Sequence, residues 1–148
     1  MEEFTFTIPI EPKSKKNSQM IVHAKGGREY IVPSPYYKKY ERQCGEYMPW
    51  PKEPISRPVN VKAVFFKKTR QRCDLVNLQE ALLDVLVKYR VLEDDKYTIV
   101  YSMDGSRVMY DKMRPRTEVT ITPVDDVWFG NGEQLTLKEI ADLELEAD

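Results

Sequence analysis

The sequence predicts a single α/β domain in which a small mixed β-sheet packs against two main helices. The chain has 148 residues, the usual size of one domain, and 41% of them are hydrophobic, which is enough for a core. Short stretches alternate apolar and polar residues, as strands do, while two longer stretches indicate helices. Because the two patterns are interspersed along the chain, helices layered on one twisted sheet are favoured.

The first third of the chain predicts a strand, a hairpin and a helix. "FTFTIPI" at 4–10 alternates apolar and polar side chains and predicts a strand. Residues 20–32 predict a hairpin, because a Gly-Gly pair lies between two apolar runs and can supply the turn. Ser34 is a suitable N-cap, and Pro35 suits the first helical position, so a helix is expected to begin there.

A second strand and the longest helix follow a proline-rich linker at 49–58. "VNVKAVFF" at 59–66 alternates like the first strand. Residues 74–89 predict a helix, because their apolar side chains recur every three or four positions and form one face. That face consists of Leu75, Leu78, Leu82, Val85, Leu86 and Tyr89.

The last third predicts two strands and an acidic end. Residues 97–103 and 116–124 have strand patterns, and the segment between them, with "DGSR" and "DKMRPR", is expected to be a loop. Residues 136–148 predict a short acidic helix or a frayed tail.

The charge of the chain is divided unevenly. The net charge is −1, yet residues 124–148 carry eight acidic side chains and one lysine, a net −7, which leaves +6 on the rest. A basic body favours an anionic partner, and the acidic segment could mask that surface. Alternatively, "VWF" at 127–129 packs on the body and the segment is structural.

The cysteine pattern and hydropathy predict a cytoplasmic protein. Cys44 and Cys73 belong to no CxxC or Cys/His array, so they are expected to be reduced thiols, and a cysteine-based zinc site is excluded. We expect no signal peptide, no membrane association and no small-molecule cofactor, because no apolar run is long enough to span a bilayer and no phosphate-cradling loop motif occurs.

Carboxylates bracket the helix predicted at 74–89. Asp74 opens it, and Asp94 and Asp95 follow its end. Taken singly, each has a structural interpretation, as an N-cap or a turn residue. Taken together with the basic segment just before Asp74, they favour a magnesium site completed by substrate phosphate. No other nucleophilic pattern occurs, and the single histidine, His23, lies in the predicted hairpin.

Basic residues cluster beside these carboxylates and predict a nucleic-acid surface. Lysine and arginine would neutralise phosphates without reading sequence. The candidates are Lys15, Lys16, Lys67, Lys68, Arg70, Arg72, Arg107, Lys112, Arg114 and Arg116. Tyr36, Tyr37, Tyr40 and Trp50 could stack on exposed bases, although at least half of them are expected in the core.

The stretch "RQRCDLVNLQEALLDVLVKYRVLEDD" resembles the RusA family of Holliday junction resolvases, which are small endodeoxyribonucleases often of phage or prophage origin. The family pattern places basic residues before D-L-D-N-L, then an apolar helix and a "DD". The likeness covers about 4–123 and is sharpest over 72–95, so residues 1–123 are expected to form the RusA-like domain and 124–148 an acidic extension.

The resemblance implies a homodimer that uses Mg2+ or Mn2+ to cut branched DNA by paired nicks in recombination and repair. It implies catalytic roles for Asp74 and Asp95 and a metal site formed by Asp74, Asp94 and Asp95. Two departures stand out: Val76 occupies the position of the second aspartate, and Glu80 that of a frequent lysine. Two alternatives therefore stay open, a non-catalytic branched-DNA-binding protein on this scaffold and a protein-interaction module acting through the acidic tail.

The helix length constrains how the carboxylates can meet. A helix over 74–89 rises roughly 22 Å, and the six residues from Tyr89 to Asp95 reach back at most about 20 Å when fully extended. Asp74 and Asp95 of one chain are therefore not expected to meet. In a two-fold dimer with antiparallel helices, Asp74 of one chain would lie beside Asp94 or Asp95 of its partner. A monomer with three unrelated surface aspartates is the alternative.

Overall fold

A mixed β-sheet forms the main body of the computed structural model, which describes residues 1–16, 19–129 and 137–146. Its order is β1-β7-β4-β5, and β6 also pairs with β4. Strands β1 and β4 are antiparallel to β7, whereas β5 and β6 run parallel to β4. The strands are β1 (Phe4–Ile8), β4 (Val59–Lys67), β5 (Val100–Ser102), β6 (Arg107–Tyr110) and β7 (Arg116–Pro123). The predicted small mixed sheet is confirmed.

Strands β5 and β6 correct the prediction for 97–116. The expected strand at 97–103 shortens to Val100–Ser102, because the amides of Ile99 and Val100 both bond to the Lys96 carbonyl and form a turn. The expected loop contains β6, which pairs with the second half of β4. Gly105, with a φ of +86°, makes the turn between the two strands.

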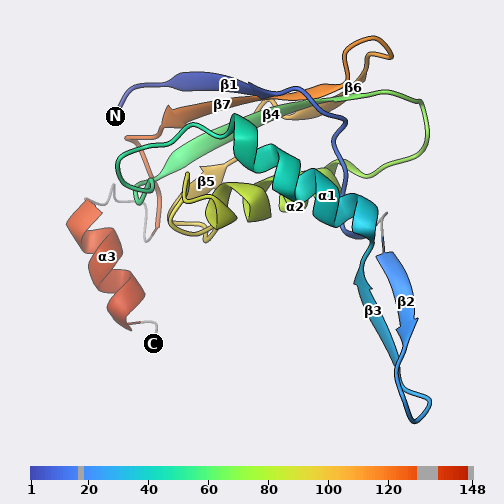
Figure 1. Cartoon of the computed structure of the whole chain (residues 1–148). Coiled ribbons are helices and arrows are strands. Elements are labelled where there is room, and N and C mark those ends of the chain that lie inside the picture. The colour runs from blue at the N-terminus through green and yellow to red at the C-terminus, as the bar shows by residue number, and fades with distance from the viewer. Residues whose placement is uncertain (17–18, 130–136, 147–148) are drawn as a thin grey trace.

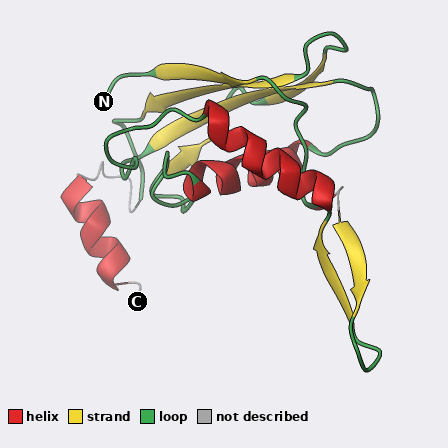
Figure 2. Cartoon of the chain, viewed as in Figure 1, coloured by secondary structure: helices red, strands yellow, loops and turns green. Residues whose placement is uncertain are grey.

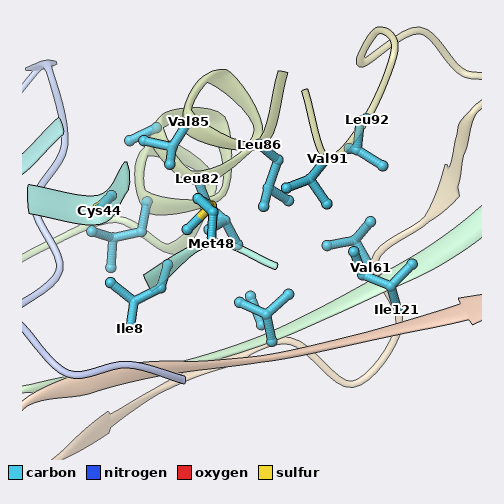
Figure 3. Close-up of a cluster of buried hydrophobic side chains, with 14 of the residues drawn as sticks. Ile8, Cys44, Met48, Val61, Leu82, Val85, Leu86, Val91, Leu92 and Ile121 are labelled. Atoms are coloured by element: carbon cyan, nitrogen blue, oxygen red, sulfur yellow. The ribbon is translucent and has the colours of Figure 1, made fainter. Parts of the chain in front are cut away.

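Helices α1 (Pro35–Cys44) and α2 (Leu75–Lys88) lie on one face of this sheet (Figure 1). Ser34 caps α1 as predicted, because its side chain accepts a hydrogen bond from the Tyr37 amide at 3.3 Å. A 3-10 helix, η2 (Gly45–Tyr47), follows α1. Figure 3 shows Leu82, Val85 and Leu86 of α2 in one buried cluster with Val61 and Ile121 of the sheet. The buried face of α2 is the one that the apolar spacing predicted, with Ala81 added and Leu75 and Tyr89 half-buried.

The end of α2 is a tight reversal of the chain. The Val91 amide donates to the Leu86 carbonyl and the Arg90 amide to the Val87 carbonyl, the bonds of a Schellman motif. Arg90 takes the left-handed conformation at φ +59°, which usually favours glycine. The following residues are then held beside the linker, where the Glu93 amide donates to the Ile55 carbonyl.

Strands β2 (Gln19–His23) and β3 (Glu29–Pro33) form a two-stranded sheet of their own. This is the predicted hairpin, and Gly26 and Gly27 supply its turn with φ values of +90° and +81°. Figure 2 shows the hairpin standing away from the body, past the helices on the side opposite the main sheet.

The C-terminal segment packs on the body through apolar side chains. Val127 and Ile140 are buried, and the Phe129 ring meets Tyr97 and Tyr101 edge-on. Residues Leu137–Glu146 form α3, so the helical interpretation of the acidic end is confirmed over this range. The predicted residues 136, 147 and 148 lie outside the described residues.

We expect Ile140→Ala to lower the free energy of unfolding by about 2 kcal/mol, because it removes a buried side chain that anchors α3. The matched control is Leu145→Ala on the same helix, where the side chain is exposed and the loss should stay below about 0.5 kcal/mol. Urea denaturation followed by circular dichroism measures both. Equal, small losses would show that α3 does not contribute to the core.

Candidate active site

Asp74 lies at the start of α2 and is exposed. It occupies the N-cap position with extended backbone, but its side chain makes no capping bond to the helix. Its Oδ2 instead accepts a hydrogen bond from the Asn77 side chain at 3.3 Å. The structural interpretation of Asp74 as a capping residue therefore fails for its carboxylate, which faces solvent at the helix end and can meet a cation.

Asp94 and Asp95 lie together in a turn beyond the other end of α2. The Asp94 Oδ1 accepts a hydrogen bond from the Asp95 amide at 2.7 Å. Burial raises the pKa of the Asp95 carboxyl above its usual range, and the neighbouring Asp94 and Asp84 raise it further. Crowded carboxylates of this kind repel one another, so the site favours a bound cation or a proton.

The structure brings Asp94 and Asp95 together but leaves Asp74 apart from them. Helix α2 has 14 residues, a rise of about 21 Å between the two ends. Within residues 1–16, 19–129 and 137–146, no three His, Cys, Asp or Glu side chains gather closely enough to hold a metal ion. The predicted set of Asp74, Asp94 and Asp95 therefore does not fit a metal within one chain, and its assembly across two chains stays a prediction.

Asp84 is an acidic residue near this site that sequence reasoning missed. It lies on α2 and its carboxylate is 3.0 Å from the Lys15 ammonium. Its charge also contributes to the raised pKa of Asp95. The signal that could have found it is the single carboxylate inside the apolar run "ALLDVL".

The two departures from the expected motif both lie on the outer surface of α2. Val76 is 63% exposed, and Glu80 is exposed one turn further on. Val76 lies two residues after Asp74 and presents an exposed apolar side chain at the position where the resemblance led us to expect a second aspartate. Glu80 lies on the same side of the helix, four residues later.

Two of the predicted phosphate-binding residues, Lys67 and Arg116, make contacts within the chain, and their role at DNA stays a prediction. The Lys67 ammonium bonds to the Glu11 carboxylate at 3.2 Å and the Pro12 carbonyl at 2.8 Å, and its side chain is 14% exposed. The Arg116 guanidinium pairs with Asp111 and Glu118, both at 2.9 Å. These partly exposed carboxylates neutralise both charges within the chain, so the DNA surface proposed below is built on the other basic residues.

The other predicted basic residues are more accessible, and five of them come from two loops at one end of the sheet. The loops follow β4 and β6, whose ends pair through Lys67 and Tyr110. Arg70 stacks on the Tyr110 ring at 4.8 Å, which connects one loop to the other strand. We call this group the basic rim; it consists of the exposed residues Lys68, Arg70, Arg72, Lys112 and Arg114. Lys16 and Arg107 are exposed elsewhere, and Lys15 pairs with Asp84.

The basic rim leads directly to Asp74 along the chain. A polar hollow of about 130 Å³ lies at this junction, with Lys13, Arg72 and Cys73 among its lining residues. Of the candidate stacking residues, Tyr37 and Tyr40 are buried core residues, as half of them were expected to be, whereas Tyr36 and Trp50 are exposed. Helix α1 buries Tyr37 and Tyr40 on its inner face and leaves Tyr36 on its outer face, while Trp50 lies in the linker that follows.

The family comparison decides the relationship of this chain to known proteins. The model of the family described as "Endodeoxyribonuclease RusA" matches residues 9–122, which is most of the chain. The chain belongs to the RusA family. No curated protein matches the sequence individually. RusA membership implies an endonuclease of the Holliday junction resolvase type, with branched DNA as substrate.

The RusA match contains both ends of α2 and the whole basic rim, while α3 lies beyond it. The resemblance expected from 72–95 is therefore confirmed at the level of the family. No described helix of this RusA-family chain is long and apolar enough to cross a membrane. Masking of the basic surface by the acidic segment stays a prediction, although the packing of Val127 and Phe129 favours a structural role for that segment.

We expect Asp95→Asn to stabilise the metal-free protein at neutral pH, by less than about 1 kcal/mol because solvent screens this exposed group. The folded-state pKa of Asp95 is raised, so ionisation costs stability as the pH rises through it. The gain should vanish below the unfolded pKa of about 3.9. Thermal unfolding in EDTA from pH 3 to 8 measures it, with Asp104→Asn, an exposed turn aspartate, as the control. A gain that persists at pH 3 would contradict the charge explanation.

Proposed function

We propose that this RusA-family chain is a metal-dependent endonuclease that resolves four-way DNA junctions by paired nicks. The observation that carries the proposal is the arrangement of carboxylates at the two ends of α2. Asp74 makes no backbone cap, and Asp94 and Asp95 are crowded into one turn at a cost in charge repulsion. Carboxylates with perturbed pKa values are often found at functional sites, and carboxylates are the side chains by which proteins bind Mg2+.

A two-fold dimer would complete the site. Since α2 separates Asp74 from Asp94 and Asp95 within a chain, two α2 helices running antiparallel across the axis would put Asp74 of one chain beside the pair of the other. Two equivalent sites would result, one for each of two opposed strands. This separation of sites suits a junction, in which two strands of like polarity are cut symmetrically.

Mg2+ or Mn2+ would be held by Asp74 from one chain and Asp94 and Asp95 from the other. Such an ion would activate water and neutralise charge on the scissile phosphate. The chain's own residues would orient the DNA. The basic rim, next to Asp74, would hold backbone phosphates on either side of the cut, and its contacts would be independent of sequence. Lys16 and Arg107 would add attraction further out.

A second candidate is a junction-binding protein that does not cut. The observation that favours it is Val76, whose exposed isopropyl group lies where RusA relatives are expected to carry an aspartate. Glu80 adds a negative charge at the position expected for a lysine. Binding without cleavage would use the same basic rim and the same dimer, so the two candidates differ only in whether the remaining carboxylates hold a metal productively.

A cleavage assay on a labelled four-way junction tests the proposal. The parent protein should cut in the presence of Mg2+ and not in EDTA, and linear duplex should be spared. Asp74→Asn should lower the rate by about 100-fold or more, because a metal ligand is lost. Junction affinity in a gel-shift should be unchanged or tighter, because a negative charge near phosphate is removed.

Asp104→Asn serves as the matched control, since it removes the same charge from an exposed turn before β6. It should cut at the parent rate. A parent protein that binds junctions without cutting them would select the non-catalytic candidate. Parent-like cutting by Asp74→Asn would show that the carboxylate at the start of α2 is not a ligand.

Mixing two inactive variants tests the two-chain site. Asp74→Asn and Asp95→Asn homodimers should each be inactive. Their heterodimer should contain one site with both substitutions and one with neither, so it should nick one strand of a junction without resolving it. Purified heterodimers with two different affinity tags, assayed on denaturing gels, provide the measurement. Heterodimers that recover no nicking would indicate that each site is built within one chain.

A further inference from the structure

The hairpin of β2 and β3 is the least supported part of the described fold. Its strands pair only with each other, and it projects from the body at the start of α1 (Figure 1). A two-stranded hairpin without a packed face is marginally stable in water. We call residues 19–33 the arm. The arm would therefore be stabilised by a surface against which it can pack.

Both faces of the arm carry exposed apolar pairs, and on one of them the apolar pair is followed by the polar pair His23 and Glu29. Ile21 pairs with Ile31 on one face, and these side chains are 58% and 68% exposed. On the other face Met20 pairs with Val32 and Val22 with Tyr30. An antiparallel hairpin with one face in water normally alternates apolar with polar residues. The arm departs from this rule, because one face is apolar throughout and the other still exposes Ile21 and Ile31, so exposure to water is unfavourable for both.

The direction of the arm indicates on which side of the molecule a packing partner would lie. It extends past the helical layer, away from the main sheet (Figure 2). Val76, Leu83 and Val87 share one stripe of α2, because they lie seven and four residues apart. Val76 is exposed, whereas Leu83 and Val87 are half-buried and also pack against the core, and Glu80 lies on the same side. A second α2 packed against this stripe would lie on the side toward which the arm extends.

We propose that the arm packs on a second copy of this chain and clamps the dimer across the two α2 helices. The inference rests on the dimer of the proposed function and names the element that holds it together. Five-residue strands span about 17 Å, which exceeds the diameter of roughly 10 Å of a helix, so the arm can reach beyond the partner's helix.

The exposed apolar area of the arm matches what a dimer requires. Met20, Ile21, Val22, Tyr30 and Ile31 together expose on the order of 500 Å², so two arms would contribute on the order of 1,000 Å² to an interface of about 1,600 Å² in total. The contacts of the two helices would supply the remainder.

The composition of the arm favours a protein partner over DNA. Its paired strands carry no lysine or arginine, and both cations of the arm, Lys25 and Arg28, lie in and beside the turn at its tip. Binding to a phosphate backbone needs cations along the contact. An apolar surface of this kind instead suits the apolar surface of another chain, and the two-chain site of the proposed function would bring a second copy of this chain to the same place.

The double variant Ile21→Thr/Ile31→Thr tests the clamp. Threonine keeps the preference for strands while removing apolar surface. Sedimentation velocity over a range of concentrations should show the parent as a dimer, and the variant's dimer dissociation constant should rise by at least about 100-fold. The matched control, Met113→Thr/Leu145→Thr, replaces two exposed apolar residues outside the arm and should leave dimerisation unchanged.

Circular dichroism should show an intact body in both variants, because neither isoleucine of the arm belongs to the core. Hydrogen exchange of the parent protein is a second measurement that needs no variant. The amides of 20–32 should be protected at concentrations where the dimer forms and should exchange faster on dilution. A variant that dimerises as tightly as the parent, or exchange that does not depend on concentration, would overturn the clamp.

The outcomes separate this inference from the proposed function. An arm variant that stays dimeric, together with heterodimers that recover nicking, would retain the two-chain site and reject the clamp. A monomeric arm variant, together with heterodimers that recover nothing, would retain the clamp and reject the two-chain site. A parent that is monomeric at every concentration would reject both.

Discussion

The packing of α2 against the sheet is the constraint on which the rest of the structure depends. Leu78, Leu82, Val85 and Leu86 are buried on the sheet, so the helix cannot bend or unwind without opening the core. Its two ends are therefore held a fixed distance apart, with Asp74 at one and Asp94 and Asp95 beyond the other. A rigid helix of this length acts as a spacer. It keeps these carboxylates apart within one chain, so a metal site that uses all three would require a second chain.

Two features at and just beyond the C-terminal end of α2 lower the stability of the fold locally. Arg90 adopts a left-handed conformation that glycine would take more easily, and Asp95 lies among like charges that raise its pKa. The rest of the fold offsets these costs, since the segment after α2 is tied to the linker through Ile55. α3 adds a further anchor directly after the aspartates, where Glu144 accepts hydrogen bonds from Thr98 and Lys96.

The basic and the acidic residues lie on different parts of the molecule. The basic rim gathers at one end of the sheet, because β4 and β6 run parallel and their following loops emerge side by side. The acidic C-terminal segment is held elsewhere, where Phe129 packs edge-on against Tyr97 and Tyr101. Val76 and Glu80 lie on the outer surface of α2. In the proposed dimer, the position of the partner's helix would determine whether these two side chains face DNA or protein.

The sequence by itself determined the class of fold, the buried face of α2, the capped start of α1, the hairpin and the aspartates at both ends of the long helix. Each of these follows from local spacing, because a helix or hairpin repeats its own period. Tertiary structure alone decided that β6 exists, since it depends on pairing with β4 about 40 residues away. It also decided that Lys67 and Arg116 form ion pairs with carboxylates, that Asp84 pairs with Lys15, and that the arm projects beyond the helices. These features depend on contacts between distant residues, which no local pattern encodes.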